Sequence, residues 1–298
     1  MLLWVLSSTS RQTSTRSKLC DLMKTRPVRF LGRIIETLRR ESNVTLEYAP
    51  RGLVGVLTPQ ANTTVEPEMQ ILLPPGFAHI NARLTSPKNT IEDRLIDYYG
   101  TLEESLDQFA NAPVQAIAIG CTGASYLVGR DREAKLIERW TKRAGVPAIT
   151  TGLAVVDALK AIGANRIGFV SCYPPALTEA SSAYWASHGF KIGEIAGSFN
   201  DDSDFHPIYS LRAANASEAL TKLRGDNHDA IVMLGTGMPT LQPIAELADV
   251  EGPPNLSCML CLAWRCVQLI EDRDPIADSV IAWSQGVGWS ARLAASKA

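Results

Sequence analysis

Long apolar runs are missing from this chain of 298 residues. No window reaches the roughly 18 uninterrupted apolar residues that a membrane-spanning helix requires, so we expect no membrane association. Histidine is also scarce, with four residues scattered along the chain. Cys258 and Cys261 have CxxC spacing, but neither a second pair nor a histidine cluster completes a zinc site, and we interpret them as core residues of a helix. The sequence therefore predicts no metal centre.

Outside the N-terminal segment, acidic residues outnumber basic ones. The first 50 residues carry nine Lys and Arg against four Asp and Glu, an excess of five, so the net charge of -2 leaves -7 on the remainder. Nothing basic is left in the body of the protein to follow a phosphate backbone, and we expect no nucleic-acid partner.

Residues 1–50 are interpreted as a basic N-terminal arm that is poorly ordered or partly helical. The apolar patch Leu2–Leu6 is too short for a secretory signal and lacks a basic flank before it. Two interpretations stay open for the arm, a targeting segment or an inert extension. The six cysteines of the chain show no disulfide framework, and reduced cysteines favour a cytoplasmic location.

Short apolar strands alternate with amphipathic helices from residue 51 onward. Predicted strands cover residues 53–57, 77–84, 116–119 and 147–150, and predicted helices begin near residue 65 and cover 91–110, 130–144 and 153–162. The helix over 91–110 places Leu95, Ile96 and Tyr99 among its apolar positions. This alternation predicts an α/β fold with parallel sheets that are buried on both faces.

The second half of the chain repeats the first. Residues 230–237 (AIVMLGTG) align without gaps with residues 116–123 (AIAIGCTG), and Gly235 falls opposite Cys121. Two further pairs of segments match at nearly the same offset, one around Gly55 and Gly168 and one before the fourth strand of each half. We therefore predict an internal duplication into two pseudo-symmetric α/β domains, residues 51–163 and 164–298. One option for the C-terminal helix is that it packs back on the first domain.

The loops at the carboxyl ends of parallel strands are the expected place for a site. If the two domains face each other, the loops after the first and third strands of both line one cleft. Cys121 and Gly235 then lie on opposite walls. Gly and Thr in these turns leave backbone N–H groups free near helix N-termini, which suits a carboxylate or an enolate oxyanion. We predict that the active site lies in the cleft between the domains.

Several segments, taken in order, resemble one enzyme superfamily. They are residues 59–64 (PQANTT) with Pro67–Glu68, residues 120–122 (GCT), residues 166–167 leading to Tyr173–Pro174, and residues 254–257 leading to Ala263–Trp264. Together they resemble the aspartate/glutamate racemase superfamily and, within it, the branch of maleate cis-trans isomerases and arylmalonate decarboxylases. The resemblance extends from about residue 53 to residue 271. It implies a cofactor-independent enzyme that acts on a small carboxylate or dicarboxylate, at a carbon next to the carboxylate.

The resemblance also implies a role for Cys121. Racemases of this superfamily use two cysteines, one on each wall, to remove a proton and return it. This chain has Gly235 at the second position, so a two-thiol racemase is not expected. Arylmalonate decarboxylases resemble the mirror case, with glycine on the first wall and cysteine on the second. A single thiol suits a single protonation, in which a carboxylate leaves and Cys121 protonates the resulting enediolate. In an isomerisation through a covalent adduct, Cys121 would be the nucleophile.

Further residues are implied as substrate-binding groups. Thr122 and Tyr173 would donate hydroxyl hydrogen bonds to the carboxylate, and Asn62 matches the isomerase-type asparagine that orients it. The remaining members are the glycines and the threonine of the two loops, Gly123, Gly235, Thr236 and Gly237, whose backbone N–H groups would add to the oxyanion site. We also expect an apolar pocket around the leaving carboxylate, since desolvation destabilises its charge.

Each of these residues also has a purely structural interpretation. Cys121 is then a buried thiol, Thr122 a helix cap, Asn62 an N-cap and Tyr173 a packing residue at a turn. Decarboxylation of a malonate-type substrate is our first hypothesis and maleate-type isomerisation the second. A third is a carboxylate-binding protein that has lost the chemistry with the second cysteine. The oligomeric state stays open, with a homodimer as one option.

Overall fold

The structure is a computed structural model that describes residues 46–199, 207–225 and 227–296. The chain divides into two units, Met1–Leu46 and Glu47–Ala298, and the described residues belong almost entirely to the second. Most of the predicted basic arm, residues 1–50, therefore lies outside the described residues.

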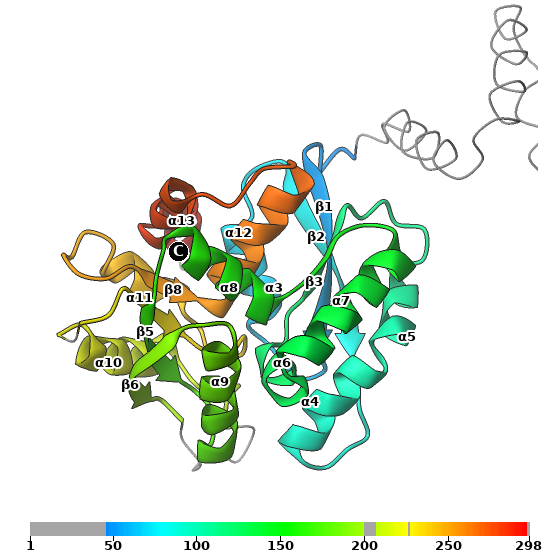
Figure 1. Ribbon diagram of the computed structural model, residues 1–298. Coiled ribbons are helices and arrows are strands. Elements are labelled where there is room, and N and C mark those ends of the chain that lie inside the picture. The colour runs from blue at the N-terminus through cyan, green and yellow to red at the C-terminus, as the bar shows by residue number, and fades with distance from the viewer. Residues whose placement is uncertain (1–45, 200–206, 226, 297–298) are drawn as a thin grey trace, which may run out of the picture. The chain divides into compact units, whose positions relative to one another are not determined.

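The first sheet contains four parallel strands in the order β2-β1-β3-β4 (Figure 1). The strands are β1 (Gly52–Pro59), β2 (Phe77–Leu84), β3 (Ala116–Ile119) and β4 (Ala148–Thr150). The central strand β1 is buried along its whole length, as expected for a parallel strand that is covered on both faces. Its register pairs Gly55 with Ile80 of β2 and with Ile117 of β3.

The second sheet repeats this topology with the order β6-β5-β7-β8, again all parallel. The strands are β5 (Arg166–Ser171), β6 (Lys191–Gly197), β7 (Ala230–Met233) and β8 (Asn255–Ser257). Strand β7 occupies the place of β3, so the two segments that align in the sequence also correspond in space. The predicted α/β fold with two pseudo-symmetric parallel sheets is confirmed.

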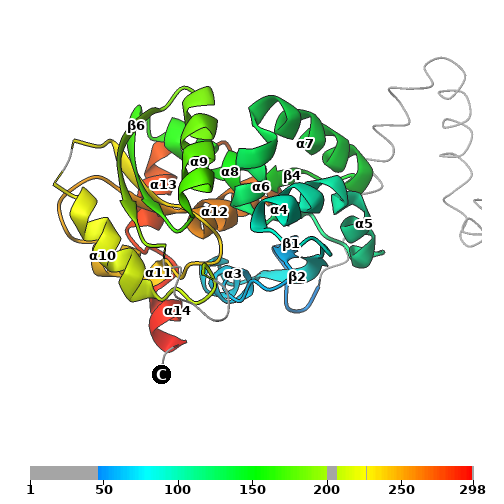
Figure 2. The same ribbon diagram turned by 90° about the horizontal axis from the view of Figure 1, so that it is seen from below.

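Helices flank both sheets (Figure 2). Those that follow the first four strands are α3 (Val65–Leu72), α4 (Ile91–Gly100), α5 (Leu102–Leu106), the 3₁₀ turn η1 (Asp107–Phe109), α6 (Thr122–Val128), α7 (Arg130–Ala144) and α8 (Thr151–Ala161). The later ones are α9 (Pro175–Ser187), α10 (Ala213–Leu223), α11 (Leu241–Glu246), α12 (Cys258–Ile270), α13 (Ala277–Ser284) and α14 (Ser290–Ala295).

The single helix predicted over residues 91–110 is wrong, because the structure breaks it into α4, α5 and η1. The break lies at Thr101, whose backbone N–H and hydroxyl both donate to the carbonyl of Asp97 and end α4 there. Ile96, which was placed among the apolar positions, is 43% exposed. The apolar spacing continued across the break, so it gave no signal of the change in direction.

Helices α8 and α12 pack against each other between the two sheets, as Figures 1 and 2 both show. Helix α12 also contacts α3 and β3, although it follows the last strand of the second sheet. Cys258, Cys261 and Cys266 of α12 are buried free thiols, which agrees with their interpretation as core residues. Near the C-terminus, Arg292 of α14 donates hydrogen bonds to the carbonyls at the end of α3.

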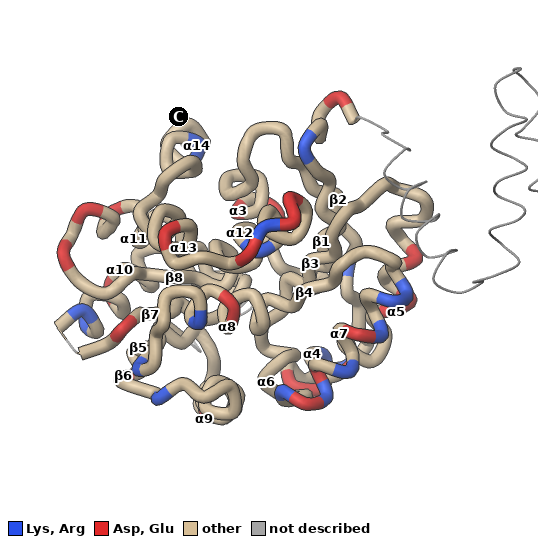
Figure 3. Tube along the Cα trace, turned by 45° about the horizontal axis from the view of Figure 1, so that its top comes forward, with Lys and Arg blue, Asp and Glu red and all other residues tan. Residues whose placement is uncertain are grey.

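Charged side chains concentrate on the outer helices, whereas β3, β4, β7 and β8 carry none (Figure 3). Within the described residues, no helix combines the length and the apolar character that crossing a lipid bilayer requires. The same residues contain no group of three or more His, Cys, Asp or Glu that is arranged to hold a metal ion.

Candidate active site

Cys121 lies between the end of β3 and the start of α6. Its backbone is extended (φ -142°, ψ 100°), and it occupies the residue position directly before the helix. The preceding Gly120 donates its N–H to the carbonyl of Leu57, and a side chain there would press against that carbonyl and against Val65. Glycine thus allows β1, β3 and α3 to approach closely, and the thiol follows at the carboxyl edge of the sheet.

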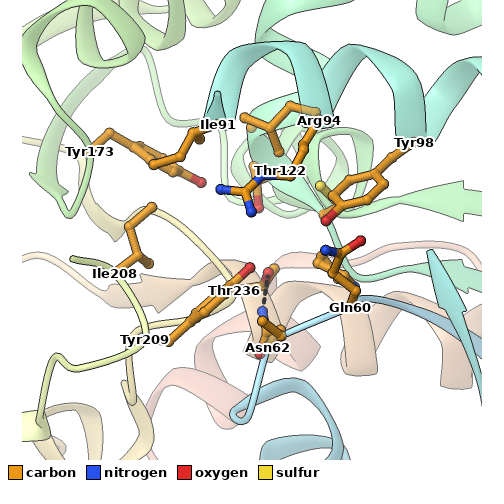
Figure 4. A pocket seen from close by; sticks show the side chains of 16 residues that line it. Gln60, Asn62, Ile91, Arg94, Tyr98, Thr122, Tyr173, Ile208, Tyr209 and Thr236 are labelled. Carbon is orange, nitrogen blue, oxygen red and sulfur yellow. Dashed lines mark hydrogen bonds between the residues drawn. The ribbon is translucent and has the colours of Figure 1, made fainter. Parts of the chain in front are cut away.

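A pocket surrounds this position and draws on both halves of the chain (Figure 4). Its lining residues are Pro59, Gln60, Ala61, Asn62, Ile91, Arg94, Leu95, Tyr98, Cys121, Thr122, Gly123, Tyr173, Ile208, Tyr209, Thr236 and Gly237. The loops after β1, β3, β5 and β7 therefore meet at one pocket, as predicted from their positions at the carboxyl ends of parallel strands. Seven of the eight predicted site residues line the pocket, and the eighth, Gly235, does not.

Burial keeps Cys121 protonated. The residue is 2% exposed, and desolvation raises the pKa of its thiol to about 12, against a smaller lowering by the backbone N–H of Ala124. At neutral pH the group is therefore a thiol that can give a proton. The Ala124 N–H faces the sulfur and would stabilise the thiolate that remains after proton transfer.

Gly235 occupies the equivalent place in the second half, but no thiol fits there. Its φ of +87° is in the region that favours glycine, and an added Cβ would overlap the sulfur of Cys172. The Cys172 thiol is fully buried and donates to the carbonyl of Leu234. Among the described residues that line the pocket, Cys121 is the only cysteine.

Thr122 and Tyr173 bring two hydroxyl groups to the pocket wall. The Thr122 hydroxyl oxygen is buried and faces the Cys258 thiol, and it makes no hydrogen bond to a nitrogen or oxygen atom of the described residues. Thr122 therefore does not cap α6. Tyr173 packs its ring edge-on against Tyr126, with ring centroids 5.8 Å apart. Burial raises the pKa of Tyr173 well above its usual range, which keeps its hydroxyl a donor. A ligand carboxylate in the pocket would accept hydrogen bonds from both hydroxyls.

Asn62 stabilises the start of α3 and also lines the pocket. Its side-chain oxygen accepts from the backbone N–H groups of Thr64 (2.8 Å) and Val65 (3.1 Å) and so caps the start of α3, although the N-cap position itself is Thr64. Its amide nitrogen donates to the Thr236 hydroxyl at 3.2 Å, and that hydroxyl donates to the Gly120 carbonyl at 2.8 Å. Only one N–H of the Asn62 amide remains for a substrate, and Thr236 offers its backbone N–H but not its hydroxyl hydrogen.

A second buried network supports the Cys121 loop from behind. The Tyr99 hydroxyl hydrogen-bonds the Ser125 hydroxyl at 2.8 Å and lies 3.3 Å from the Cys121 carbonyl oxygen. Glu133 of α7, which is fully buried, accepts from the Tyr184 hydroxyl at 2.6 Å. Burial raises the pKa of Glu133. These contacts fix α6 and thereby the direction of the thiol.

Sequence reasoning missed the contribution of α4 to the pocket. Arg94 and Tyr98 of α4 line it, together with Gln60 and Tyr209. Gln60 accepts from the backbone N–H of Ser86 at 2.7 Å through its side-chain oxygen, and its amide points toward the pocket in Figure 4. Arg94 and Tyr98 are four residues apart and so share one helix face, but nothing in the sequence indicated that this face meets the cleft.

Comparison with known proteins agrees with the fold. Residues 54–280 match the family described as arylmalonate decarboxylase, and the chain belongs to that family. Maleate isomerase of Alcaligenes faecalis is 24% identical over 235 residues, which cover 74% of this chain and 90% of that protein.

Solved structures share the fold. The maleate isomerase Iso from Pseudomonas putida S16 has a TM-score of 0.68 at 24% identity, covering 74% of this chain and 93% of that one. A liganded arylmalonate decarboxylase variant, in which a glycine is replaced by cysteine and a cysteine by serine, has a TM-score of 0.62 at 18% identity. It covers 73% of this chain and 92% of its own.

Proposed function

We propose that this protein is a cofactor-independent decarboxylase of malonate-type substrates, in which Cys121 protonates the enediolate. The observation that carries the proposal is the asymmetry of the two walls. Cys121 is a buried, protonated thiol on one wall, while the φ of Gly235 and the sulfur of Cys172 exclude a thiol from the equivalent place on the other. One acid without an opposing base suits a reaction with a single proton transfer to carbon.

The reaction balances with the residues present. The bond between the α-carbon and one carboxylate breaks, CO₂ leaves, and the electron pair passes into the remaining carboxylate to form an enediolate. The hydroxyls of Thr122 and Tyr173 and the backbone N–H of Gly237 stabilise the developing oxyanion. Cys121 then transfers its proton to the α-carbon, and water reprotonates the thiolate. The apolar side chains of Ile91 and Ile208 supply the wall that disfavours a solvated leaving carboxylate.

Maleate-type isomerisation is the second candidate, and the similarity to the maleate isomerase of A. faecalis favours it. A further observation in its favour is that the pocket contains both the hydroxyls of Thr122 and Tyr173 and the guanidinium of Arg94, which could bind the two carboxylates of maleate. The pKa of about 12 argues against it, because a nucleophilic addition requires the thiolate at neutral pH.

The experiment compares the wild-type protein with Cys121→Ala. Release of labelled bicarbonate from phenylmalonate and from alkylmalonates measures decarboxylation, and loss of maleate absorbance measures isomerisation. We expect bicarbonate release by the wild type and a loss of roughly 10²- to 10⁴-fold in Cys121→Ala. Cys266→Ala, a buried cysteine of α12 outside the pocket, is the matched control and should retain activity.

Each other outcome has a distinct meaning. Loss of maleate without bicarbonate release would select the isomerase. Carboxylate binding that survives in Cys121→Ala, with no turnover by the wild type, would select the binding protein. A decarboxylase that is unaffected by Cys121→Ala would refute the proposed proton donor.

A further inference from the structure

Arg94 of α4 is the only residue with a formal charge among the described residues that line the pocket. It is partly buried, and Figure 4 shows its guanidinium extending into the space between Tyr173 and Tyr98. Burial raises the pKa of Tyr98 to about 12 and that of Tyr209 above its usual range, and in both cases the Arg94 charge acts in the opposite direction. The guanidinium therefore lies within electrostatic reach of both hydroxyls.

No ion pair or hydrogen bond joins the Arg94 side chain to another residue of the described ranges. The nearest acid along the same helix face, Asp97, instead accepts from the Ser86 hydroxyl at 2.5 Å. Other arginines of the described part do have carboxylate partners: Arg51, Arg83, Arg139, Arg143, Arg265 and Arg273. A partly desolvated guanidinium without a counterion is unfavourable, so the pocket is prepared for an anion.

The proposed decarboxylation does not use this charge. In that proposal the hydroxyls of Thr122 and Tyr173, which both line the pocket, bind the carboxylate that becomes the enediolate. A guanidinium paired with the departing carboxylate would stabilise the substrate relative to CO₂ and so oppose the reaction. Arg94 is better suited to an anion that the substrate keeps throughout.

We propose that Arg94 determines substrate specificity by binding a further carboxylate in the side chain of the substrate. The substrate class is then a malonate whose α-carbon carries a carboxylate-bearing substituent, and the product is a dicarboxylate. This inference rests on the proposed decarboxylase function. Bidentate pairing of Arg with carboxylate provides both the affinity and the orientation that places the α-carbon before Cys121.

The test uses matched acid and amide substrates. Carboxymethylmalonate and 2-carboxyethylmalonate are each compared with the malonate in which the side-chain carboxylate is a neutral primary amide of the same shape. Two chain lengths show how far the guanidinium reaches. We expect kcat/KM of the wild type to favour the acid roughly 10- to 100-fold, which is the size of a charge-assisted interaction.

Arg94→Gln should bring the acid-to-amide ratio of kcat/KM close to one by lowering only the value for the acid. Arg94→Lys should restore part of the preference for the acid. Arg132→Gln, an exposed arginine of α7 outside the pocket, is the control and should leave the ratio unchanged. The inference is overturned if the wild type does not favour either acid. It is also overturned if Arg94→Gln slows acid and amide equally, because Arg94 would then hold one of the two geminal carboxylates.

A binding measurement separates this inference from the proposed function. If the wild type turns over none of the malonates, decarboxylation fails. Calorimetry with Cys121→Ala then compares succinate with its monoamide, succinamate. Preference for succinate that disappears in the Cys121→Ala/Arg94→Gln protein supports the carboxylate site by itself, and equal binding of the two compounds refutes it.

Discussion

The Asn62 amide donates a hydrogen bond of 3.2 Å to the hydroxyl of Thr236, which lies 174 residues further along the chain. The same asparagine caps α3 through its side-chain oxygen. One residue thus joins a helix start in the first half to the pocket loop of the second half. Removing it should affect folding and ligand binding by separable routes.

We expect Asn62→Ala to lower the free energy of unfolding by about 1–3 kcal/mol, because it removes the α3 cap and the bond to Thr236. Asn62→Asp keeps the capping oxygen and should cost less stability, while its negative charge raises KM for a carboxylate substrate. Urea unfolding and steady-state kinetics measure the two effects. Asn165→Ala, at an exposed position, is the control. Equal destabilisation by both Asn62 variants would contradict the assignment of the cap.

Glu68 should make stability depend on pH. It is 5% exposed and accepts from the Thr240 N–H (2.6 Å), the Thr240 hydroxyl and the Leu241 N–H, which links α3 to the start of α11. Burial raises its pKa from 4.5 to about 7. Between these two pH values the folded state binds more protons than the unfolded state, so the free energy of unfolding falls as pH rises, by at most about 3 kcal/mol.

In Glu68→Gln that contribution is absent, because the amide does not titrate. Urea unfolding at pH 5 and pH 8 should therefore show a smaller loss of stability with rising pH in the variant than in the wild type. Subtracting the two profiles removes the contributions of other groups, including Glu133. Parallel profiles would show that Glu68 does not titrate in this range.

Cys121 should react slowly with alkylating reagents. With a pKa of about 12, its thiolate fraction at pH 8 is roughly 10⁻⁴, and the fraction increases about tenfold for each pH unit up to the pKa. The rate of iodoacetamide modification, followed by intact mass and peptide mapping, should rise in this way between pH 8 and pH 10. A plateau below pH 9 would indicate a thiolate and would favour the nucleophilic role.

Gly235→Ala should destabilise the protein for two reasons, the positive φ and the overlap with Cys172. We expect a loss of about 2–4 kcal/mol in the free energy of unfolding. Gly129→Ala is the matched control, because Gly129 also has a positive φ (+74°) but has open space around its added Cβ. The difference between the urea midpoint of Gly235→Ala and that of Gly129→Ala measures the cost of the overlap with Cys172. If both substitutions cost the same, Cys172 does not exclude a side chain at position 235.

The alternation of strands and helices could be predicted from the sequence itself, except over residues 91–110, where one predicted helix is replaced by α4, α5 and η1. Periods of apolar residues and turn residues at strand ends are local properties, and the repeat of residues 116–123 in 230–237 placed Cys121 and Gly235 in equivalent loops. Parallel strands then required those loops to lie at the carboxyl edges of their sheets. The strand-end geometry thus predicted that these loops meet at one site, whereas the resemblance to a known family implied the roles of Asn62, Thr122 and Tyr173 there.

Only the tertiary structure decided which face of α4 meets the pocket and which groups are already engaged. Arg94 and Tyr98 became pocket residues because of the way α4 packs on α6. Gly235 does not line the pocket, and the Cys172 sulfur occupies the space that a side chain at Gly235 would need. The hydroxyl of Thr236 is engaged with Asn62 and Gly120, which are close only once both halves have folded. Periodicity is a property of neighbouring residues, whereas these outcomes depend on contacts between separate segments of the folded chain, and the sequence pattern alone does not specify those contacts.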